Sequence, residues 1–244
     1  MAIYPTITRA EYDALPGINW SALKAGIGKT AAHVATARAG RPDKPAYKFG
    51  RAFHHAVLQP ELLAGWEIVD GKTTTKPNAV TASEIESIRA MATAALALHG
   101  GKITHQECGL TWTAYGRECK ALIDGMWGGW LLDLKSTQNA DPAAFRGEIF
   151  KFKYHGQCAW YLDGLAANSI TAAGACLLAV EKAAPYAAGM YALTDAWIDL
   201  GRTLCAEAIA VLDDDRHDYG YQDLDVPDWA QPGITENDEG GIDA

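Results

Sequence analysis

The chain has 244 residues, of which 49% are hydrophobic, so it can bury a substantial core and is expected to be globular. Its formal net charge of -9 disfavours long-range attraction of a polyanion, so any site for one must depend on local basic residues and metal ions. Five scattered cysteines without a CxxC motif argue against a disulfide framework or a structural zinc site. Without a signal peptide or a stretch near the roughly 20 apolar residues of a membrane helix, the sequence predicts a soluble, cytoplasmic protein.

Helices are predicted in the first part of the chain. Residues 18–40 form a helix-rich segment with Ser21 as a cap and Gly40 as a stop. Residues 48–61 have apolar side chains at helical spacing, and Pro60 ends that helix.

The clearest helical signal covers residues 81–100. Thr81 and Glu84 form a capping box, an apolar stripe follows at helical spacing, and Gly100 stops the helix. These signals predict a helix with defined ends.

An antiparallel three-stranded meander is predicted over residues 105–137, with turns at Tyr115-Gly116 and at Gly128-Gly129. If Trp127 faces Trp130 across the second turn, Asp124 falls directly opposite Asp133. Like charges in opposed positions destabilise a sheet, so this pairing indicates a function rather than a structural role.

Side chains alternate along a strand, so the hairpin has a charged face and an apolar face. The predicted charged face carries Lys120, Asp124, Asp133 and Lys135. The predicted apolar face carries Ala121, Ile123, Leu132 and Leu134.

The last part of the chain alternates helix and strand. A long helix is expected over residues 140–168, with strands at 173–182 and 186–193 and a final helix from Thr194. We expect one α/β domain over residues 1–228 and an acidic, disordered tail over residues 229–244.

The two aspartates suit a hard divalent cation such as Mg²⁺, which prefers oxygen ligands and would relieve their repulsion. Lys135 lies two residues after Asp133 on the same face, where it could orient an attacking water or stabilise charge on a phosphate. The alternative is a solvated sheet face with charges placed by chance.

Asp124 followed by Asp133-Leu134-Lys135 resembles the PD-(D/E)xK nuclease signature. Residues 50–61 are similar to the GxxxH helix of RecB-like nucleases, and counting from Gly50 selects His54 rather than His55.

A third motif follows the same order. Gln157 and Tyr161 resemble the QxxxY helix of that family, and they share a helix face at i, i+4. Residues 119–124 and 180–193 are similar to segments of RecE-type exonucleases of phages and prophages, and the resemblance covers roughly residues 11–230.

The resemblance implies a mixed central sheet flanked by helices. It also implies that Mg²⁺ or Mn²⁺ is held by His54, Asp124, Asp133 and the Leu134 carbonyl, with Lys135 beside the attacked phosphate. The cysteines do not match the iron-sulfur pattern of some relatives, and no GxxxxGK[ST] loop is present, so we expect neither a cluster nor ATP use.

Several further residues could serve either the function or only the packing and solubility of the protein. Gln157 and Tyr161 either contact DNA phosphate or support the site, or they simply pack their helix. Glu107 either reaches the metal through water or lies on the surface. Basic side chains that could bind DNA phosphates, or be merely solvated, are Lys120, Lys151, Lys153 and His155.

These features together predict a metal-dependent deoxyribonuclease, an exonuclease that resects linear duplex DNA ends for phage-type recombination. The resemblance further suggests 5′ to 3′ digestion, a homo-oligomer and a single-strand annealing protein as partner. One alternative is a DNA-end-binding or assembly module that keeps the nuclease fold without turnover. Another is a carbohydrate-active enzyme that uses the paired aspartates as acid and base.

Overall fold

The largest sheet of the computed structural model has five strands in the order β10-β9-β8-β7-β4. The structure describes residues 1–5, 7–40, 44–71, 76–101 and 103–214, so the predicted tail at 229–244 lies outside the described residues. Strands β8 and β9 are parallel and the other neighbours are antiparallel, which makes the sheet mixed, as predicted. Its strands are β4 (Ile103–Thr104), β7 (Gly125–Trp127), β8 (Trp130–Thr137), β9 (Ala175–Glu181) and β10 (Ala188–Leu193).

A second, antiparallel sheet has the order β1-β5-β6. Its strands are β1 (Ala2–Tyr4), β5 (Cys108–Ala114) and β6 (Arg117–Ile123). Strand β6 ends one residue before Asp124 and β7 begins one residue after it, so the chain passes from one sheet to the other at Asp124. The predicted three-stranded meander is therefore wrong: the segment forms two hairpins in two sheets.

Gly125 makes this passage between the sheets possible. A Cβ atom at Gly125 would lie 2.4 Å from the Ile103 side chain and 3.1 Å from the Thr104 carbonyl oxygen. Only glycine allows β4 to approach the chain so closely at the point where it changes sheets.

The hairpin register around Gly128-Gly129 is confirmed. Trp127 pairs with Trp130, and Gly125 pairs with Leu132. Asp124 itself lies outside the ladder, so it is not paired with Asp133 as predicted.

The predicted division into two faces fails for β6. Ala121 and Ile123 pack in one core cluster with Leu131, whereas Leu132 and Leu134 belong to the cluster on the opposite face. Side chains alternate regularly only within one continuous strand, and this strand is interrupted at Asp124.

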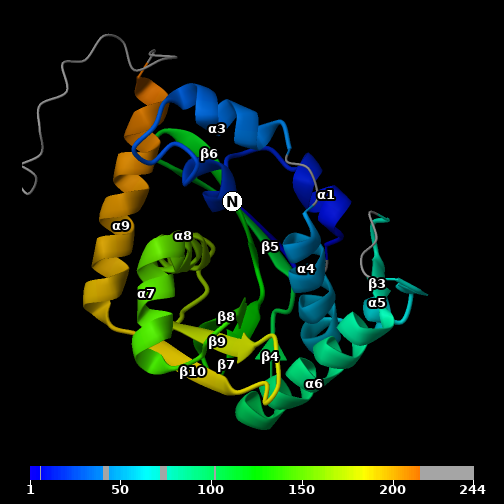
Figure 1. Ribbon diagram of the computed structural model, residues 1–244. Helices are drawn as coiled ribbons and strands as arrows, with labels where there is room; N and C mark the ends of the chain where they lie inside the picture. The colour runs from blue at the N-terminus through cyan, green and yellow to red at the C-terminus, as the bar shows by residue number, and fades with distance from the viewer. Residues whose placement is uncertain (6, 41–43, 72–75, 102, 215–244) are drawn as a thin grey trace, which may run out of the picture.

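Helices cover both faces of the five-stranded sheet (Figure 1). Helices α4 (Pro45–Leu58) and α6 (Ala82–His99) pack against Leu132 and Leu134 on one face. Helices α7 (Pro142–Phe152), α8 (Tyr154–Ala167) and α9 (Asp195–Ala210) contribute to the cluster on the other face. The expected mixed sheet flanked by helices is confirmed.

The remaining elements are short. They are α1 (Arg9–Ala14), α2 (Trp20–Leu23), α3 (Ala31–Arg38), α5 (Pro60–Leu63), the parallel strands β2 (Glu67–Val69) and β3 (Ala79–Thr81), and a 3₁₀ turn at Val211–Asp213. Within the described residues, no helix has the length and apolar character needed to cross a membrane.

The helix boundaries follow the local signals in most places. Thr81 and Glu84 form the predicted capping box of α6, and Gly100 ends that helix in the left-handed conformation. The cap of α2 is Asn19 rather than Ser21, because the Asn19 side chain accepts the Ala22 N–H.

The long helix predicted over residues 140–168 is wrong, because it consists of two helices. Lys153 adopts a left-handed conformation with φ of 60°, which ends α7 and begins α8. The predicted strands on either side of Pro185 are confirmed as β9 and β10.

Candidate active site

His54 joins three parts of the fold. It lies on α4, one turn after Gly50, and its Nδ1 is 3.4 Å from Oδ1 of Asp124. Its Nε2 is 3.1 Å from the carbonyl oxygen of Leu134 on β8. The structure therefore brings together three of the four predicted metal-binding groups.

The charge state of His54 follows from this position. Burial disfavours the imidazolium, but the Asp124 carboxylate outweighs burial and raises the pKa of His54 to about 9. A divalent cation at this place would displace that proton, since neutral imidazole is the metal-binding form.

Asp124 is held rigidly at the passage between the sheets. Its Oδ2 accepts a 2.6 Å hydrogen bond from the backbone N–H of Leu134. Burial opposes ionisation, but His54, Lys135 and this N–H together hold the pKa of Asp124 below its usual value. Asp124 is therefore an ionised, buried carboxylate.

Glu107 completes a group of three possible metal ligands. One ligand atom from each of His54, Glu107 and Asp124 lies within 4.8 Å of the others. The Glu107 backbone has a positive φ of 47°, and its N–H donates to the Asp124 carbonyl oxygen at 3.2 Å. Burial and the Asp124 carboxylate raise the pKa of Glu107 to about 7.

The chemistry of this donor set fits a divalent cation. Two carboxylates and an imidazole supply oxygen and nitrogen ligands, and a cation would offset both the burial and the carboxylate repulsion that raise the pKa of Glu107. The sequence alone left Glu107 between an indirect metal contact and the surface, and the structure places it directly in this group.

Asp133 and Lys135 form a second group beside the first. The Lys135 ammonium pairs with Oδ2 of Asp133 and donates a 3.2 Å hydrogen bond to Oε1 of Gln157. The Gln157 amide nitrogen donates to Oδ1 of Asp133 and to the Tyr161 hydroxyl, both at 3.0 Å. Asp133 thus faces Lys135 and Gln157 and is not one of the three grouped ligands.

Burial opposes charge on both residues of this second group, but it prevails only at Asp133. Asp133 is 1% exposed, and burial raises its pKa although Lys135 opposes the shift. Burial of Lys135 favours the neutral amine, but the carboxylates of Asp133 and Asp124 outweigh it and raise the pKa of Lys135 above the ordinary value. The ammonium therefore stays charged.

Tyr154 belongs to this site but was not predicted. The Lys135 ammonium lies 4.6 Å from the centre of the Tyr154 ring, in a cation–π contact. Tyr154 precedes Gln157 by three residues on α8, so spacing on the QxxxY helix was the signal that could have identified it.

Lys120 is not on the charged face with Asp133 and Lys135, and that prediction is wrong. Strand β6 belongs to the other sheet, and the Lys120 ammonium donates to the carbonyl oxygens of Tyr12, Asp13 and Leu15 at the end of α1.

The predicted basic stretch lies at the junction of α7 and α8. Lys151 is exposed in the last turn of α7 and Lys153 connects the two helices. His155 is buried, so the prediction that it adds to a basic surface is wrong.

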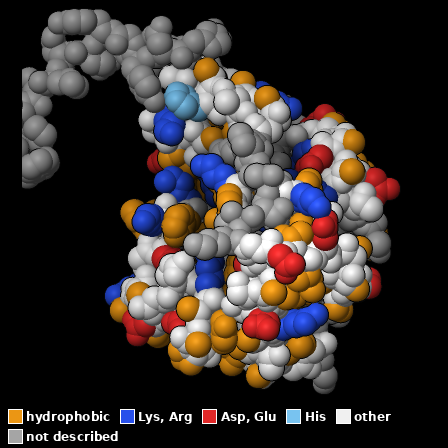
Figure 2. All heavy atoms as spheres, turned by 45° about the vertical axis from the view of Figure 1, so that its right-hand side comes forward, with side chains coloured by type: hydrophobic (Ala, Val, Ile, Leu, Met, Phe, Trp, Pro, Cys, Tyr) orange, Lys and Arg blue, Asp and Glu red, His pale blue; other side chains and the backbone are white. Residues whose placement is uncertain are grey.

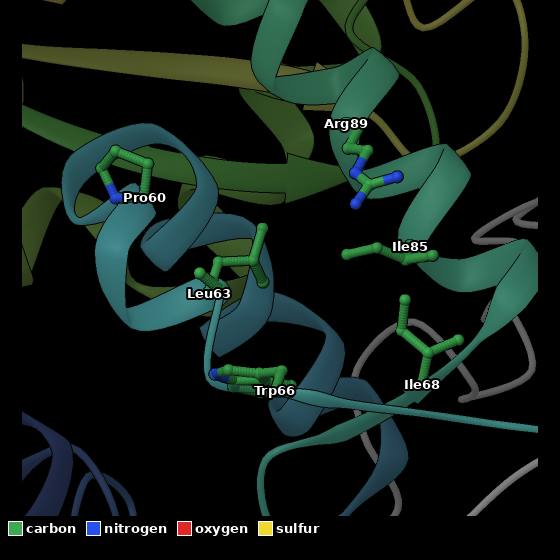
Figure 3. Close-up of a pocket in the computed structure, with 7 residues that line it drawn as sticks. Pro60, Leu63, Trp66, Ile68, Ile85 and Arg89 are labelled. Atoms are coloured by element: carbon green, nitrogen blue, oxygen red, sulfur yellow. The ribbon is translucent and has the colours of Figure 1, made fainter.

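A separate apolar depression lies between α5, β2 and α6 (Figure 3). None of the residues that line it belongs to the two groups described above. The depression is lined by Pro60, Leu63, Ala64, Trp66, Ile68, Ile85 and Arg89.

Comparison with known proteins agrees with this architecture. The solved structure of a "Putative exonuclease" from Eubacterium rectale superposes with a TM-score of 0.60 at 12% sequence identity, covering 85% of this chain and 87% of that one. At this identity the similarity shows the fold alone. No curated protein matches the sequence significantly.

A family model for a PDDEXK-like domain of unknown function matches residues 20–215, a range that includes both groups of the site. This match covers most of the chain. The chain therefore belongs to the PDDEXK-like family DUF3799, within the PD-(D/E)xK nuclease superfamily.

Proposed function

We propose that the protein is a metal-dependent deoxyribonuclease. The observation that carries the proposal is the convergence of His54, Glu107 and Asp124, from separate elements, beside the buried pair of Asp133 and Lys135. Mg²⁺ or Mn²⁺ bound by the three grouped side chains and the Leu134 carbonyl would polarise a phosphate and activate water. Asp133 stays a proposed ligand on the strength of the PD-(D/E)xK motif, although its two carboxylate oxygens contact Lys135 and Gln157.

Lys135 would stabilise the phosphate as negative charge develops on it. Its ammonium is fixed by Asp133, Gln157 and the Tyr154 ring, so little reorganisation is needed during the reaction. Because its pKa is raised, Lys135 acts as a charged group rather than as a general base. Gln157 is a positioning residue, since both ends of its amide are used to hold Lys135 and Asp133.

Local basic residues would bind the DNA backbone despite the net charge of -9. Figure 2 shows that Lys and Arg side chains gather toward the centre and left of one face of the molecule. Lys151 and Lys153 adjoin α8, which carries Gln157, so they are the proposed phosphate contacts near the site.

The finer proposal is an exonuclease that resects linear duplex ends, in the 5′ to 3′ direction, during phage-type recombination in a bacterial cytoplasm. The RecE-type sequence motifs support it, and the structural relative carries the description "Putative exonuclease". The sequence offers no convincing linker between two halves, which supports a single domain over residues 1–228. A homo-oligomer and a single-strand annealing partner are proposed from the family resemblance alone, because no particular residue carries them. The side chains needed for hydrolysis are intact, which favours an enzyme over a DNA-end-binding module.

Digestion of end-labelled DNA tests this proposal. A linear duplex labelled at each 5′ or 3′ end is compared with a closed circle in Mg²⁺, Mn²⁺ or EDTA. We expect cation-dependent loss of the linear DNA only, with the 5′ label released first. Release of the 3′ label first would show digestion in the 3′ to 5′ direction. Cutting of the closed circle would show that the protein is an endonuclease rather than an exonuclease.

A further inference from the structure

Two exposed phenylalanine rings lie at the junction of α7 and α8, within the sequence Phe150-Lys151-Phe152-Lys153-Tyr154. Phe150 is 64% exposed and Phe152 is 42% exposed, although large apolar side chains usually lose most of their exposure on folding. Aromatic and basic residues alternate through this stretch.

Each ring is supported on one side. The Phe150 ring stacks on the ring of buried His155, with centroids 6.0 Å apart and an interplanar angle of 8°. The Phe152 ring packs against Tyr154 at 5.6 Å. Each ring therefore packs against a neighbouring ring and yet remains exposed, which is the arrangement that stacking on a planar ligand requires.

The stretch is continuous with the proposed active site. The Phe152 ring contacts Tyr154, and the Tyr154 ring contacts the Lys135 ammonium at 4.6 Å. A nucleotide chain whose phosphate lies at Lys135 would thus have its neighbouring bases near Phe152, and Phe150 lies two residues before Phe152 at the end of α7.

The charges beside the rings favour an anionic ligand. The Lys151 ammonium lies 5.4 Å from the centre of the Phe152 ring. Neither Lys151 nor Lys153 is in a salt bridge with the described residues, so both ammonium groups can pair with phosphates. Charged residues are depleted at the core of protein–protein interfaces, whereas here lysines alternate with the exposed rings.

We propose that Phe150 and Phe152 form a stacking platform for unpaired bases of the DNA strand that enters the site. This inference rests on the proposed nuclease function and adds the form of its substrate: a strand whose bases next to the reacting phosphate are separated from their partners. Lys151 and Lys153 hold the backbone of that strand while the two rings hold its bases.

Binding of two single-stranded probes in EDTA tests the platform without hydrolysis. One probe is a fluorescent oligothymidylate, and the other has the same length and label but abasic sugars. Stacking on an aromatic ring typically strengthens binding at least about fivefold per base, so the wild type should prefer the thymidylate by that factor or more. Phe152→Ala and the double variant with Phe150→Ala should lose most of this preference while binding the abasic probe normally.

Three further variants make the outcome specific. Phe152→Trp should keep the preference, and Lys151→Ala should weaken the binding of both probes equally. Leu62→Ala removes a comparably exposed apolar side chain on α5. This variant should keep both the preference for the thymidylate and the affinity for the abasic probe. Circular dichroism checks that each variant is folded.

Two results would overturn the platform. An unchanged preference in the double variant would show that the rings do not stack on bases. Conversion of an oligomeric wild type into monomers by the same variant, with the preference kept, would show that the rings form a subunit interface.

Digestion of a linear duplex by the wild type in Mg²⁺, measured in parallel, separates the two proposals. If the wild type digests DNA but the double variant keeps its base preference, only the platform fails. If the double variant loses that preference but the wild type digests nothing, only the nuclease function fails.

Discussion

The carboxylate of Asp124 accepts a 2.6 Å hydrogen bond from the backbone N–H of Leu134. This bond ties the residue at which the chain changes sheets to the middle of strand β8. The same contact places an ionised oxygen beside the Leu134 carbonyl that meets His54. One side chain thus serves both the fold and the site.

Substitution of Asp124 separates these two roles. Asp124→Asn can still accept the Leu134 N–H, whereas Asp124→Ala leaves that buried donor unpaired, which costs about 1–3 kcal/mol. Urea unfolding in EDTA should therefore give a lower free energy of unfolding for the alanine variant than for the asparagine variant. Equal values for the two variants would contradict the structural role of this hydrogen bond.

Cations should stabilise the folded protein through His54, Glu107 and Asp124. A ligand that binds only the native state at 100 times its dissociation constant adds about 2.7 kcal/mol to the free energy of unfolding. We expect Mg²⁺ or Mn²⁺ to raise the melting temperature of the wild type, and to do so far less in Glu107→Gln. Glu61→Gln on α5 is the matched control, because it removes an exposed carboxylate outside the group and should keep the full rise. A rise in melting temperature in Glu107→Gln as large as that of the wild type would show that Glu107 does not bind the cation.

Gln157→Leu tests the positioning of Lys135. The change removes the hydrogen bond that Lys135 donates to the Gln157 side chain and the one that this side chain donates to Asp133. Misplacement of a reacting group by about 1 Å can reduce the rate about 100-fold. We expect kcat to fall by about 10- to 100-fold with little change in KM. Tyr161→Phe, which loses only its hydrogen bond with Gln157, should have a smaller effect. A rise in KM alone would instead make Gln157 a DNA contact.

Lys120→Met should destabilise the N-terminal part of the fold. The substitution leaves the carbonyl oxygens of Tyr12, Asp13 and Leu15 without their charged donor, and hydrogen bonds to charged groups contribute about 1.5–3 kcal/mol. Amide hydrogen exchange in α1 should become faster, while exchange in α6 should not change. Unchanged exchange in α1, together with weaker DNA binding, would restore the phosphate-binding role predicted from the sequence.

Local signals in the sequence were sufficient for much of the fold. The capping box at Thr81 and the stop at Gly100 define α6 because both act within a few residues. Gly128-Gly129 determined the hairpin register for the same reason. These features depend on backbone geometry that neighbouring residues determine.

Other features depend on contacts between distant parts of the chain. The change of sheets at Asp124 requires β4 to pass close to Gly125, and no local pattern reports that approach. Lys153 takes a left-handed conformation that lysine does not favour, so the break between α7 and α8 was missed.

The candidate site shows the same division. Spacing along the sequence selected His54, Asp124 and the pair of Asp133 and Lys135 as candidates, and the fold places His54 against Asp124 and Lys135 against Asp133. The position of Glu107 beside His54 and Asp124 depends on tertiary structure. The packing of β4 against β7 brings the loop that carries Glu107 to Asp124.

The rate of nucleotide release from a linear duplex by the wild type and by Lys135→Ala, with Mg²⁺ and then with EDTA, tests the central claim most directly. We predict release by the wild type that requires Mg²⁺ and falls by at least about 100-fold in Lys135→Ala, as expected for loss of a charged group that stabilises the transition state. Equal release by folded wild type and variant, or release that persists in EDTA, would contradict a metal-dependent nuclease at this site.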